Sequence, residues 1–254
     1  MSKETILIIG GTGKVGTSYI QFFLNKGWNV IFTTRSKLRK NKLEKKFPTN
    51  KNKIKGYVIN LLDKNSCKKL SKQLKKDKFS INHLINSARN LDFLKNNKKT
   101  GKTTKENFLN EYLMDVFIPY EMSFEIFKQN KKTLKTITNI GSQYGLVGSN
   151  PILYKNKFNQ YPIQYSVAKA ALIHLTKELA IKFYKNKVRV NCLALGGIEG
   201  RVNSKFKKRY AKLTPMGRML NENDILKPLE MIIDNNSKAI NGQTIIADGG
   251  WTLW

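Results

Sequence analysis

The feature that most constrains the fold is a short apolar run, residues 5–9, followed at once by glycines. Such a run is typical of a strand buried in a parallel sheet. The next residues, Gly11-Thr-Gly13-Lys-Val-Gly16, open an amphipathic segment. A glycine turn between the first strand and its helix lets the backbone approach a pyrophosphate, and the helix N-terminus attracts the negative charge. We therefore expect this turn to bind a dinucleotide through Gly10, Gly11, Thr12, Gly13, Lys14, Val15 and Gly16, the alternative being a merely tight turn.

Strand and helix patterns alternate along the rest of the chain. Strands are expected at 5–9, 29–34, 53–60, 81–86, 133–140, 188–195 and 244–247, and helices at 14–26, 38–47, 65–76, 104–130, 165–184 and 223–234. Alternation of this kind predicts right-handed β-α-β units and an α/β, doubly wound, mainly parallel sheet with helices on both faces, a Rossmann fold. No repeat or break divides the chain, so we expect one domain over 1–254, with substrate loops at about 144–163 and 197–220.

The formal net charge of +30 is the most unusual number in the sequence. Nucleic acid or an anionic membrane is one explanation. The lysines, however, fall on nearly every expected surface segment, and no aromatic-interleaved basic motif accompanies them. We therefore expect neither nucleic acid nor membrane as a partner. No stretch of roughly 18 apolar residues and no signal peptide is evident. With Cys67 and Cys192 isolated from each other, we expect a cytoplasmic protein with reduced thiols and no metal site.

The second chemical signal is Tyr165-Ser-Val-Ala-Lys169. Residues four apart on a helix lie on one face, so the lysine ammonium would lie beside the phenol. A neighbouring cation favours the phenolate form and makes the tyrosine a plausible proton donor and acceptor for a C–OH or C=O group. Tyr-x-x-x-Lys occurs often by chance, so it indicates a catalytic pair only in combination with the glycine turn.

The second expected strand ends in Thr34-Arg35-Ser36. An acidic residue at this place binds the adenosine ribose of NAD. A guanidinium instead suits a ribose 2′-phosphate, to which it can make two hydrogen bonds. We expect NADP rather than NAD, although Arg35 stacked on the adenine would discriminate little.

Five motifs in this order resemble those of the short-chain dehydrogenase/reductase family: the glycine turn, Asn86-Ser-Ala88, Ser142, Tyr165 with Lys169, and Asn191 to Gly197. The resemblance covers essentially the whole chain. It implies an NAD(P)-dependent oxidoreductase in which Tyr165 is the acid/base, Ser142 holds the substrate oxygen, and Lys169 supports Tyr165 and the nicotinamide ribose. It also implies that further residues line the cofactor channel: Asn60, Leu61, Asn86, Ala88, Gly196 and Ile198.

Three residues depart from the family pattern. Arg89 stands where glycine is usual, Asp115 aligns with the asparagine that carries a proton-relay water, and Leu195 stands where Pro-Gly is usual. We place Asp115 in the catalytic set, although its charge would work against a phenolate. These changes leave open an alternative class, a cofactor-binding protein with lost or altered catalysis. A sugar-nucleotide epimerase or dehydratase is disfavoured because too little chain follows Tyr165 for a substrate domain.

The stretch between Ser142 and Tyr165 is longer than usual in the family. Together with 205–219 and the ending Asp248-Gly-Gly-Trp251, it is similar to a bacterial branch associated with surface or flagellin sugars. A polar sugar derivative is therefore a candidate substrate, to which four residues could supply stacking and charge: Tyr154, Tyr161, Arg201 and Arg218. The alternative is a variable lid over any small carbonyl compound.

The expected helix 165–184 is apolar on nearly all sides. A helix of this kind must be covered twice, once by the sheet and once by another element. We expect a partner subunit, giving a homodimer or homotetramer, with burial inside a monomer as the alternative. His83 and His174 lack ligands at suitable spacing and are expected to serve packing.

Overall fold

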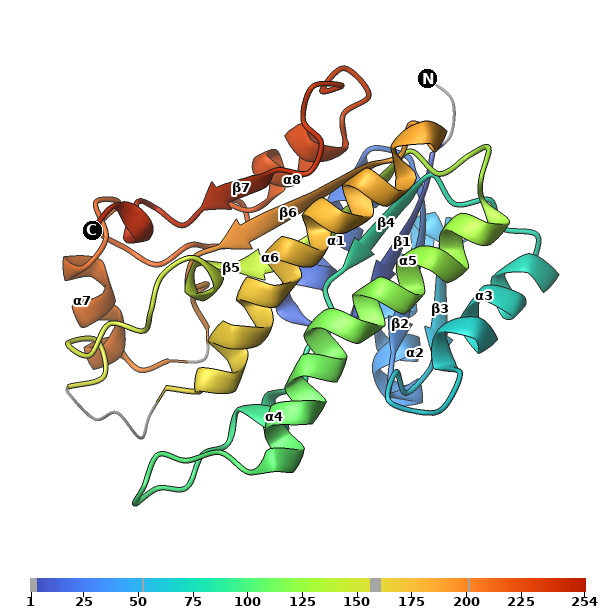
Figure 1. Cartoon of the computed structure of the whole chain (residues 1–254). Helices are drawn as coiled ribbons and strands as arrows, with labels where there is room; N and C mark the ends of the chain where they lie inside the picture. Colours follow the sequence, from blue (N-terminus) through green and yellow to red (C-terminus); the bar gives the residue numbers. More distant parts are fainter. Residues whose placement is uncertain (1–3, 52, 156–160, 201) are drawn as a thin grey trace.

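The computed structural model describes residues 4–51, 53–155, 161–200 and 202–254. Its centre is a seven-stranded sheet in the order β3-β2-β1-β4-β5-β6-β7, in which every neighbouring pair is parallel (Figure 1). The strands are β1 (Thr5–Ile9), β2 (Asn29–Thr34), β3 (Ile54–Val58), β4 (His83–Asn86), β5 (Thr136–Ser142), β6 (Arg189–Leu195) and β7 (Thr244–Ala247). The predicted doubly wound fold is confirmed.

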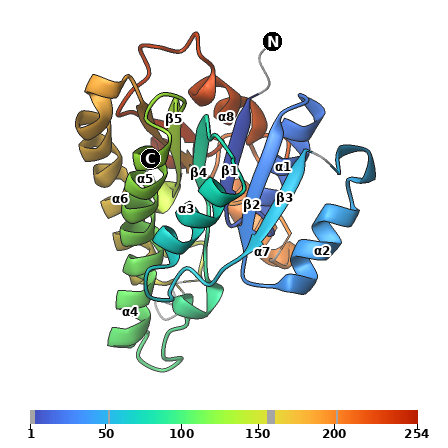
Figure 2. The ribbon, with the colours of Figure 1, turned by 90° about the vertical axis from the view of Figure 1, so that its right-hand side faces the viewer.

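Helices cover both faces of the sheet, as Figure 2 shows. One face carries α1 (Lys14–Asn25), α2 (Lys37–Lys45) and α8 (Leu226–Ile233); the other carries α3 (Ser66–Lys76), α4 (Lys105–Tyr112), α5 (Ile118–Gln129) and α6 (Ile163–Phe183). Successive side chains of a strand point to opposite faces. In β1, accordingly, Ile6 and Ile8 join the core under α1, whereas Leu7 and Ile9 join the core under α5 and α6. This double burial explains why the run is apolar at every position.

The long helix expected at 104–130 is interrupted. Between α4 and α5 lies a π-helical turn, Leu113–Phe117, in which the N–H of Ile118 bonds the carbonyl of Leu113. Pro119 follows and has no N–H with which to continue the ordinary ladder. Such turns widen a helix and are frequent at functional sites. Here the turn carries Asp115, which is buried.

Smaller corrections concern element ends. β5 extends to Ser142, because Gly141 and Ser142 still pair with Ala194 and Leu195. The central helix α6 begins at Ile163 rather than Tyr165. The excursion after β6 contains an unexpected helix, α7 (Ser204–Lys212), whose cap is the side chain of Asn203. Its hydrophobic positions are few, so the sequence pattern gives little sign of it.

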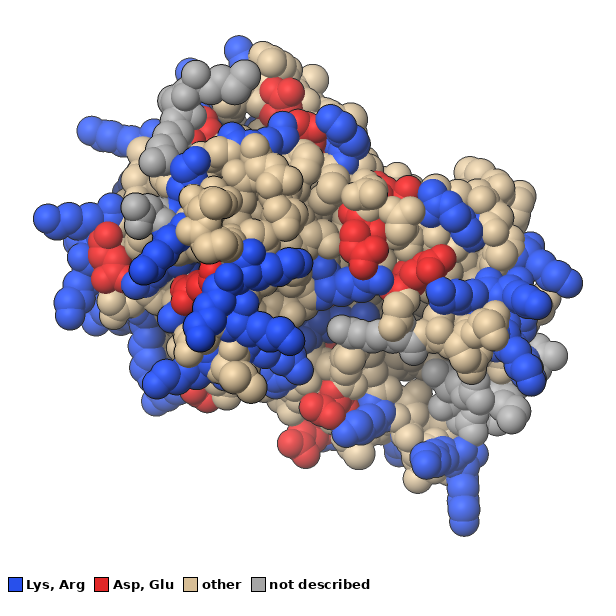
Figure 3. Space-filling model, turned by 180° about the vertical axis from the view of Figure 1, so that it is seen from behind, with Lys and Arg blue, Asp and Glu red and all other residues tan. Residues whose placement is uncertain are grey.

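The basic residues are distributed over the surface. Figure 3 shows lysine and arginine side chains spread across the rear face, with acidic side chains and uncharged surface between them. Among the described helices, none is both long enough and apolar enough to cross a membrane.

Candidate active site

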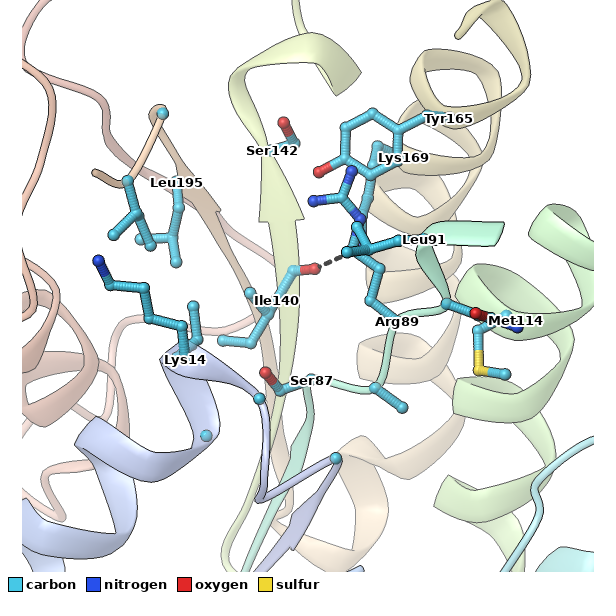
Figure 4. A pocket seen from close by; sticks show the side chains of 18 of the residues that line it. Lys14, Ser87, Arg89, Leu91, Met114, Ile140, Ser142, Tyr165, Lys169 and Leu195 are labelled. Carbon is cyan, nitrogen blue, oxygen red and sulfur yellow. Dashed lines mark hydrogen bonds between the residues drawn. The ribbon is translucent and has the colours of Figure 1, made fainter. Parts of the chain in front are cut away.

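A large cleft opens at the carboxyl ends of the central strands, with a volume of about 1000 Å³. In open parallel sheets this edge is where ligands bind. Its walls come from the turn after β1, the loop after β4, the end of β5, the first turns of α6 and the loop after β6 (Figure 4). One cleft therefore collects segments from across the whole chain.

The turn after β1 forms the floor of the cleft. Gly10 has φ +87°, and a Cβ there would lie 2.6 Å from the backbone of Ala88. A Cβ on Gly16 would lie 2.5 Å from the carbonyl oxygen of Gly10. Helix α1 begins after Gly13 with no side-chain cap, so its first N–H groups face the cleft without a competing acceptor. These features fit a dinucleotide pyrophosphate.

The adenosine end of the cleft is basic. Arg35 and Arg39 both line it, and Arg35 Nη2 lies 3.4 Å from Asn90 Oδ1. Leu61 lines it as well, but Asn60 does not; its amide donates to Asp63 Oδ1 at 2.7 Å. No carboxylate ends β2, so this wall offers positive charge to a ribose or its phosphate.

Lys14 crosses the cleft toward the opposite wall. Its ammonium donates to the backbone oxygen of Glu199 and pairs with Glu222 Oε1 at 2.9 Å. Lys14 therefore links the glycine turn to the segment after β6 and is already engaged by protein partners.

Tyr165 and Lys169 stand one turn apart on α6, as expected. Lys169 is buried, and its ammonium donates to the carbonyl of Ile140 at 2.9 Å (Figure 4). It also lies 3.1 Å from Asp115 Oδ2. Burial, the largest single influence, would lower the pKa of Lys169, but the Asp115 carboxylate and Tyr165 together raise it. A charged ammonium is thereby fixed beside the phenol.

Ser142 ends β5 on the wall next to Tyr165, and the hydroxyls of both residues face the same space (Figure 4). The Ser142 oxygen accepts a hydrogen bond from the N–H of Tyr144 at 3.2 Å. Its own proton is therefore available to a ligand. Ser142, Tyr165 and Lys169 are brought together in one wall of the cleft.

Of the other expected cofactor residues, most line the cleft: Gly10, Thr12, Gly13, Lys14, Val15, Gly16, Arg35, Leu61, Ala88, Gly196 and Ile198. Gly11 and Asn86 lie behind it. A Cβ on Gly11 would meet Phe32, and the Asn86 amide donates to Asn139 Oδ1 at 2.8 Å. Asn139 in turn donates to Thr176 at 3.0 Å. Asn86 thus ties β4 to β5 and α6 rather than facing the cleft.

The far end of the cleft is aromatic. Tyr144, Tyr154, Phe206 and Tyr210 line it. Trp251, from the C-terminal segment, stacks on Tyr210 with ring centroids 4.5 Å apart. This wall offers flat apolar surface beside polar hydroxyls.

The tyrosine wall is held by hydrogen bonds. The Tyr210 hydroxyl donates to Gln143 Oε1 at 2.9 Å and accepts from the N–H of Gly197 at 2.8 Å. Gln143 and Tyr210 were not expected in the site, because nothing in their spacing distinguishes them from packing residues.

Two residues expected near the substrate do not line the cleft. Tyr161 packs against Tyr154 with centroids 5.3 Å apart, and Arg218 pairs with Asp224 through both guanidinium nitrogens. Arg201 lies outside the described residues.

A family model described as enoyl-(acyl carrier protein) reductase matches residues 15–252, nearly the whole chain. The chain belongs to the short-chain dehydrogenase/reductase family. Post-translational flagellin modification protein A of Campylobacter coli is 26% identical and covers 100% of both chains. A short-chain dehydrogenase of Leptospira borgpetersenii with bound NAD+ is 25% identical, with TM-score 0.85 over 98% of this chain and 93% of that one. ElxO with NADP bound has TM-score 0.85, 22% identity and coverage of 99% and 100%.

This short-chain dehydrogenase/reductase is thus an oxidoreductase of the nicotinamide-dinucleotide type. Its three departures lie in the walls of the cleft or just behind them. Leu195 lines the cleft, and Arg89 places its guanidinium 4.3 Å from the centroid of the Tyr165 ring. Asp115 lies behind Lys169 and does not line the cleft. Four residues before it, Glu111 is also buried, a feature that the sequence motif does not reveal.

Proposed function

We propose that this protein is an NADP-dependent oxidoreductase that interconverts a carbonyl and an alcohol on a polar, sugar-derived substrate, with Tyr165 as the acid/base. The observation that carries the proposal is the position of Tyr165, whose ring lines the dinucleotide-sized cleft beside the buried ammonium of Lys169. A phenol flanked by a fixed cation can release a proton and hold the resulting charge.

In the reduction of a carbonyl compound, a bound nicotinamide cofactor would supply the hydride to the carbonyl carbon, and the chain's own residues act on the carbonyl oxygen. Ser142 donates a hydrogen bond to the carbonyl oxygen, since its own acceptor position is already used by the Tyr144 N–H. Tyr165 gives its proton to the same oxygen as negative charge develops there. The ammonium of Lys169 stabilises the phenolate, and oxidation runs the same steps in reverse.

The preference for NADP rests on Arg35 and Arg39. Both line the end of the cleft next to β2, which itself ends without a carboxylate; the acid Asp92, which also lines the cleft, is paired with Lys95. Two guanidinium groups at this place favour a 2′-phosphate over a bare ribose through charge-assisted hydrogen bonds.

The sugar assignment rests on the aromatic wall. Tyr144, Tyr154 and Tyr210 present flat rings and hydroxyls within one end of the cleft. Aromatic faces stack on the apolar face of a sugar ring while hydroxyls bond its polar groups. The relative named as a post-translational flagellin modification protein is consistent with the flagellin-sugar branch that the sequence resembles.

The second candidate function is binding of the dinucleotide with altered catalysis. It is favoured by Arg89, whose guanidinium covers a face of the Tyr165 ring and makes the site more crowded and more positive than a glycine would. On this proposal the protein binds the cofactor tightly but transfers no hydride to a carbonyl.

One experiment separates the two functions. The purified protein is titrated with NADPH and with NADH, following nicotinamide fluorescence, and turnover is then measured with a panel of keto-sugars and sugar phosphates. Tight NADPH binding with turnover supports the first function. Tight binding with no turnover across the panel favours the second, and no binding of either cofactor contradicts both.

The assembly is proposed to be a homo-oligomer formed through α5 and α6. These helices lie side by side on one face of the sheet (Figure 1). Their outer surfaces expose Tyr120, Val167 and Ile181, of which Ile181 is 66% exposed, and Phe117 of the preceding π-helical turn is exposed as well. An apolar surface of this kind is typical of an interface. Cys67 and Cys192 are both buried free thiols, which supports a cytoplasmic location.

A further inference from the structure

Glu111 is a buried acid that the site described above does not use. It lies in the last turn of α4, with 0% of its surface exposed. Neither of its carboxyl oxygens has a hydrogen-bond partner in the described part of the chain. An ionised carboxylate in such a place would be strongly destabilised, because it has lost water and gained no donor. Glu111 is therefore best accommodated with a proton.

A second acid lies four residues further on, in the π-helical turn that follows α4. Asp115 is 2% exposed, and its Oδ2 lies 3.1 Å from Lys169 Nζ. Asp115 follows Glu111 by four residues across the junction of α4 and the π-helical turn, and positions about one helical turn apart lie near the same face. The Asp115 charge acts on Glu111 on one side and on the Lys169 ammonium on the other, so Asp115 connects Glu111 to the cation that supports Tyr165.

The charges around this pair come from three elements. Burial is the main cause that raises the pKa of Glu111 to about 7, and the Asp115 charge is the second. The positive charges of Arg89 and Lys169 act in the opposite direction and lower it. Arg89 lies on the loop after β4, while Lys169 and Tyr165 belong to α6. The short helix 91–94, which also packs on α4, contributes only Asp92 and its partner Lys95, both exposed. Two buried acids are thus balanced by two cations.

We propose that Glu111 and Asp115 hold one proton between them, and that this pair of acids returns a proton to the Lys169 amine after each proton transfer at Tyr165. The proposal rests on the oxidoreductase function stated above. Glu111 touches neither substrate nor cofactor and is a positioning residue that acts through Lys169. Arg89, in place of glycine, lowers the cost of the second negative charge when the proton has left.

The transfer balances for the reduction of a carbonyl. The Tyr165 O–H bond breaks as the substrate O–H bond forms, leaving a phenolate. Lys169 then gives one ammonium proton to the phenolate and becomes a neutral amine. The acid pair gives its shared proton to that amine, so Tyr165 and Lys169 return to their starting forms and both carboxylates are ionised. A proton from solvent refills the pair, and no electrons move in these steps.

The shared proton is tested on the cofactor-free protein by infrared spectroscopy. Wild type should show the carbonyl stretch of a protonated carboxyl group that disappears with a midpoint near pH 7, measured from about pH 5 to about pH 9. Glu111→Gln should lose this band, and Glu106→Gln, an exposed acid on the same helix, should keep it. No titrating band in wild type, or an unchanged band in Glu111→Gln, would overturn the proposal.

Asp115→Asn provides a second variant should Glu111→Gln fail to fold. Because the Asp115 charge is one cause of the raised pKa of Glu111, its removal should move the midpoint of the band to lower pH. A midpoint that does not move would show that the two acids are not coupled, and the pair would be abandoned.

The refilling of Lys169 is tested by the pH dependence of kcat for carbonyl reduction. Wild-type kcat should fall as pH rises through about 7, because the acid pair then loses the proton that it would give to Lys169. In Glu111→Gln this inflection should be absent, and kcat below it should drop by about 10-fold or more. An inflection retained in Glu111→Gln contradicts the transfer. Failure of the oxidoreductase function would appear instead as no turnover by wild type, and leaves the infrared result intact.

Discussion

The guanidinium of Arg89 lies 4.3 Å from the centroid of the Tyr165 ring, and the ammonium of Lys169 lies 5.7 Å from the same centroid. Two cations from different elements thus face one phenol. A cation over an aromatic face is attracted by the ring quadrupole, by roughly 0.5–2 kcal/mol depending on exposure. This contact holds the ring in place through its face and leaves the hydroxyl free for chemistry.

That relationship makes Tyr165→Phe an informative variant. Phenylalanine keeps the ring that Arg89 and Lys169 contact and removes only the hydroxyl, so the fold should be unchanged. Turnover should fall by about 10²–10⁴-fold, the usual contribution of a general acid. NADPH affinity should stay within about 3-fold, since most cofactor contacts lie elsewhere in the cleft. Steady-state kinetics and fluorescence titration measure both; a loss of folding or of NADPH binding would make the residue structural.

Arg35 tests the choice between the two dinucleotides. A charge-assisted hydrogen bond contributes about 1.5–3 kcal/mol, so Arg35→Ala should weaken NADPH binding by about 10- to 100-fold and leave NADH nearly unchanged. Lys42→Ala, an exposed change on α2 outside the cleft, is the control. The ratio of the two dissociation constants is the readout. If Arg35→Ala leaves that ratio as in wild type, Arg35 does not select the phosphate.

Much of the fold could be predicted because its signals are local. The apolar runs of β2 and β7 and the glycine turn carry their structure in a few adjacent residues, and the predicted bounds of these strands agree with the observed ones. The π-helical turn was missed because its cause, Pro119, is tolerated in the first turn of a helix and gives no sign of the wider turn before it.

The sequence predicted only those residues of the site that belong to a recognisable motif. Ser142, Tyr165 and Lys169 line the cleft as expected from their motifs. Glu111 was missed because an acid on a polar helix ordinarily faces solvent, and only the packing of α4 against α6 and the loop after β4 buries it. Gln143 and Tyr210 were missed for a similar reason, since their contact joins segments 67 residues apart.

Gly16 and Gly13 form a matched pair for testing the turn. A Cβ on Gly16 would lie 2.5 Å from the Gly10 oxygen and 2.7 Å from Gly11 Cα, both backbone atoms that cannot move freely. A Cβ on Gly13 would meet only the Gly10 oxygen, at 3.4 Å. Gly16→Ala should therefore lower the free energy of unfolding by about 1–3 kcal/mol, and Gly13→Ala by clearly less.

Chemical denaturation of the two glycine variants gives these free energies, and a cofactor titration of the same samples shows whether the turn still binds. Equal destabilisation by both changes would mean that the close approach of α1 to the turn is not the constraint.

At the opposite end of the sheet, Glu4 should make stability depend on acid pH. The His83 ring and the Lys135 ammonium lower the pKa of Glu4 from 4.5 to about 2, although burial acts to raise it. A lowered folded-state pKa contributes stability that is present above the unfolded value and is lost as pH falls through the folded one. The window is therefore pH 4.5 down to about pH 2. Burial lowers the pKa of His83, so its ring is neutral near pH 7 and Lys135 supplies the opposing charge.

Wild type should accordingly lose about 1–3 kcal/mol more than Glu4→Gln across that window, since each pKa unit corresponds to about 1.4 kcal/mol and a neutral ring interacts less strongly than a cation. Glu106→Gln, which changes an exposed acid, should follow wild type. Urea unfolding at a series of pH values measures all three proteins. Glu4 lies at the amino ends of the strands, far from the cleft edge, so the cofactor affinity of Glu4→Gln at neutral pH should match that of wild type. If the free energies of unfolding of wild type and Glu4→Gln change in parallel with pH, Glu4 does not make stability depend on acid pH.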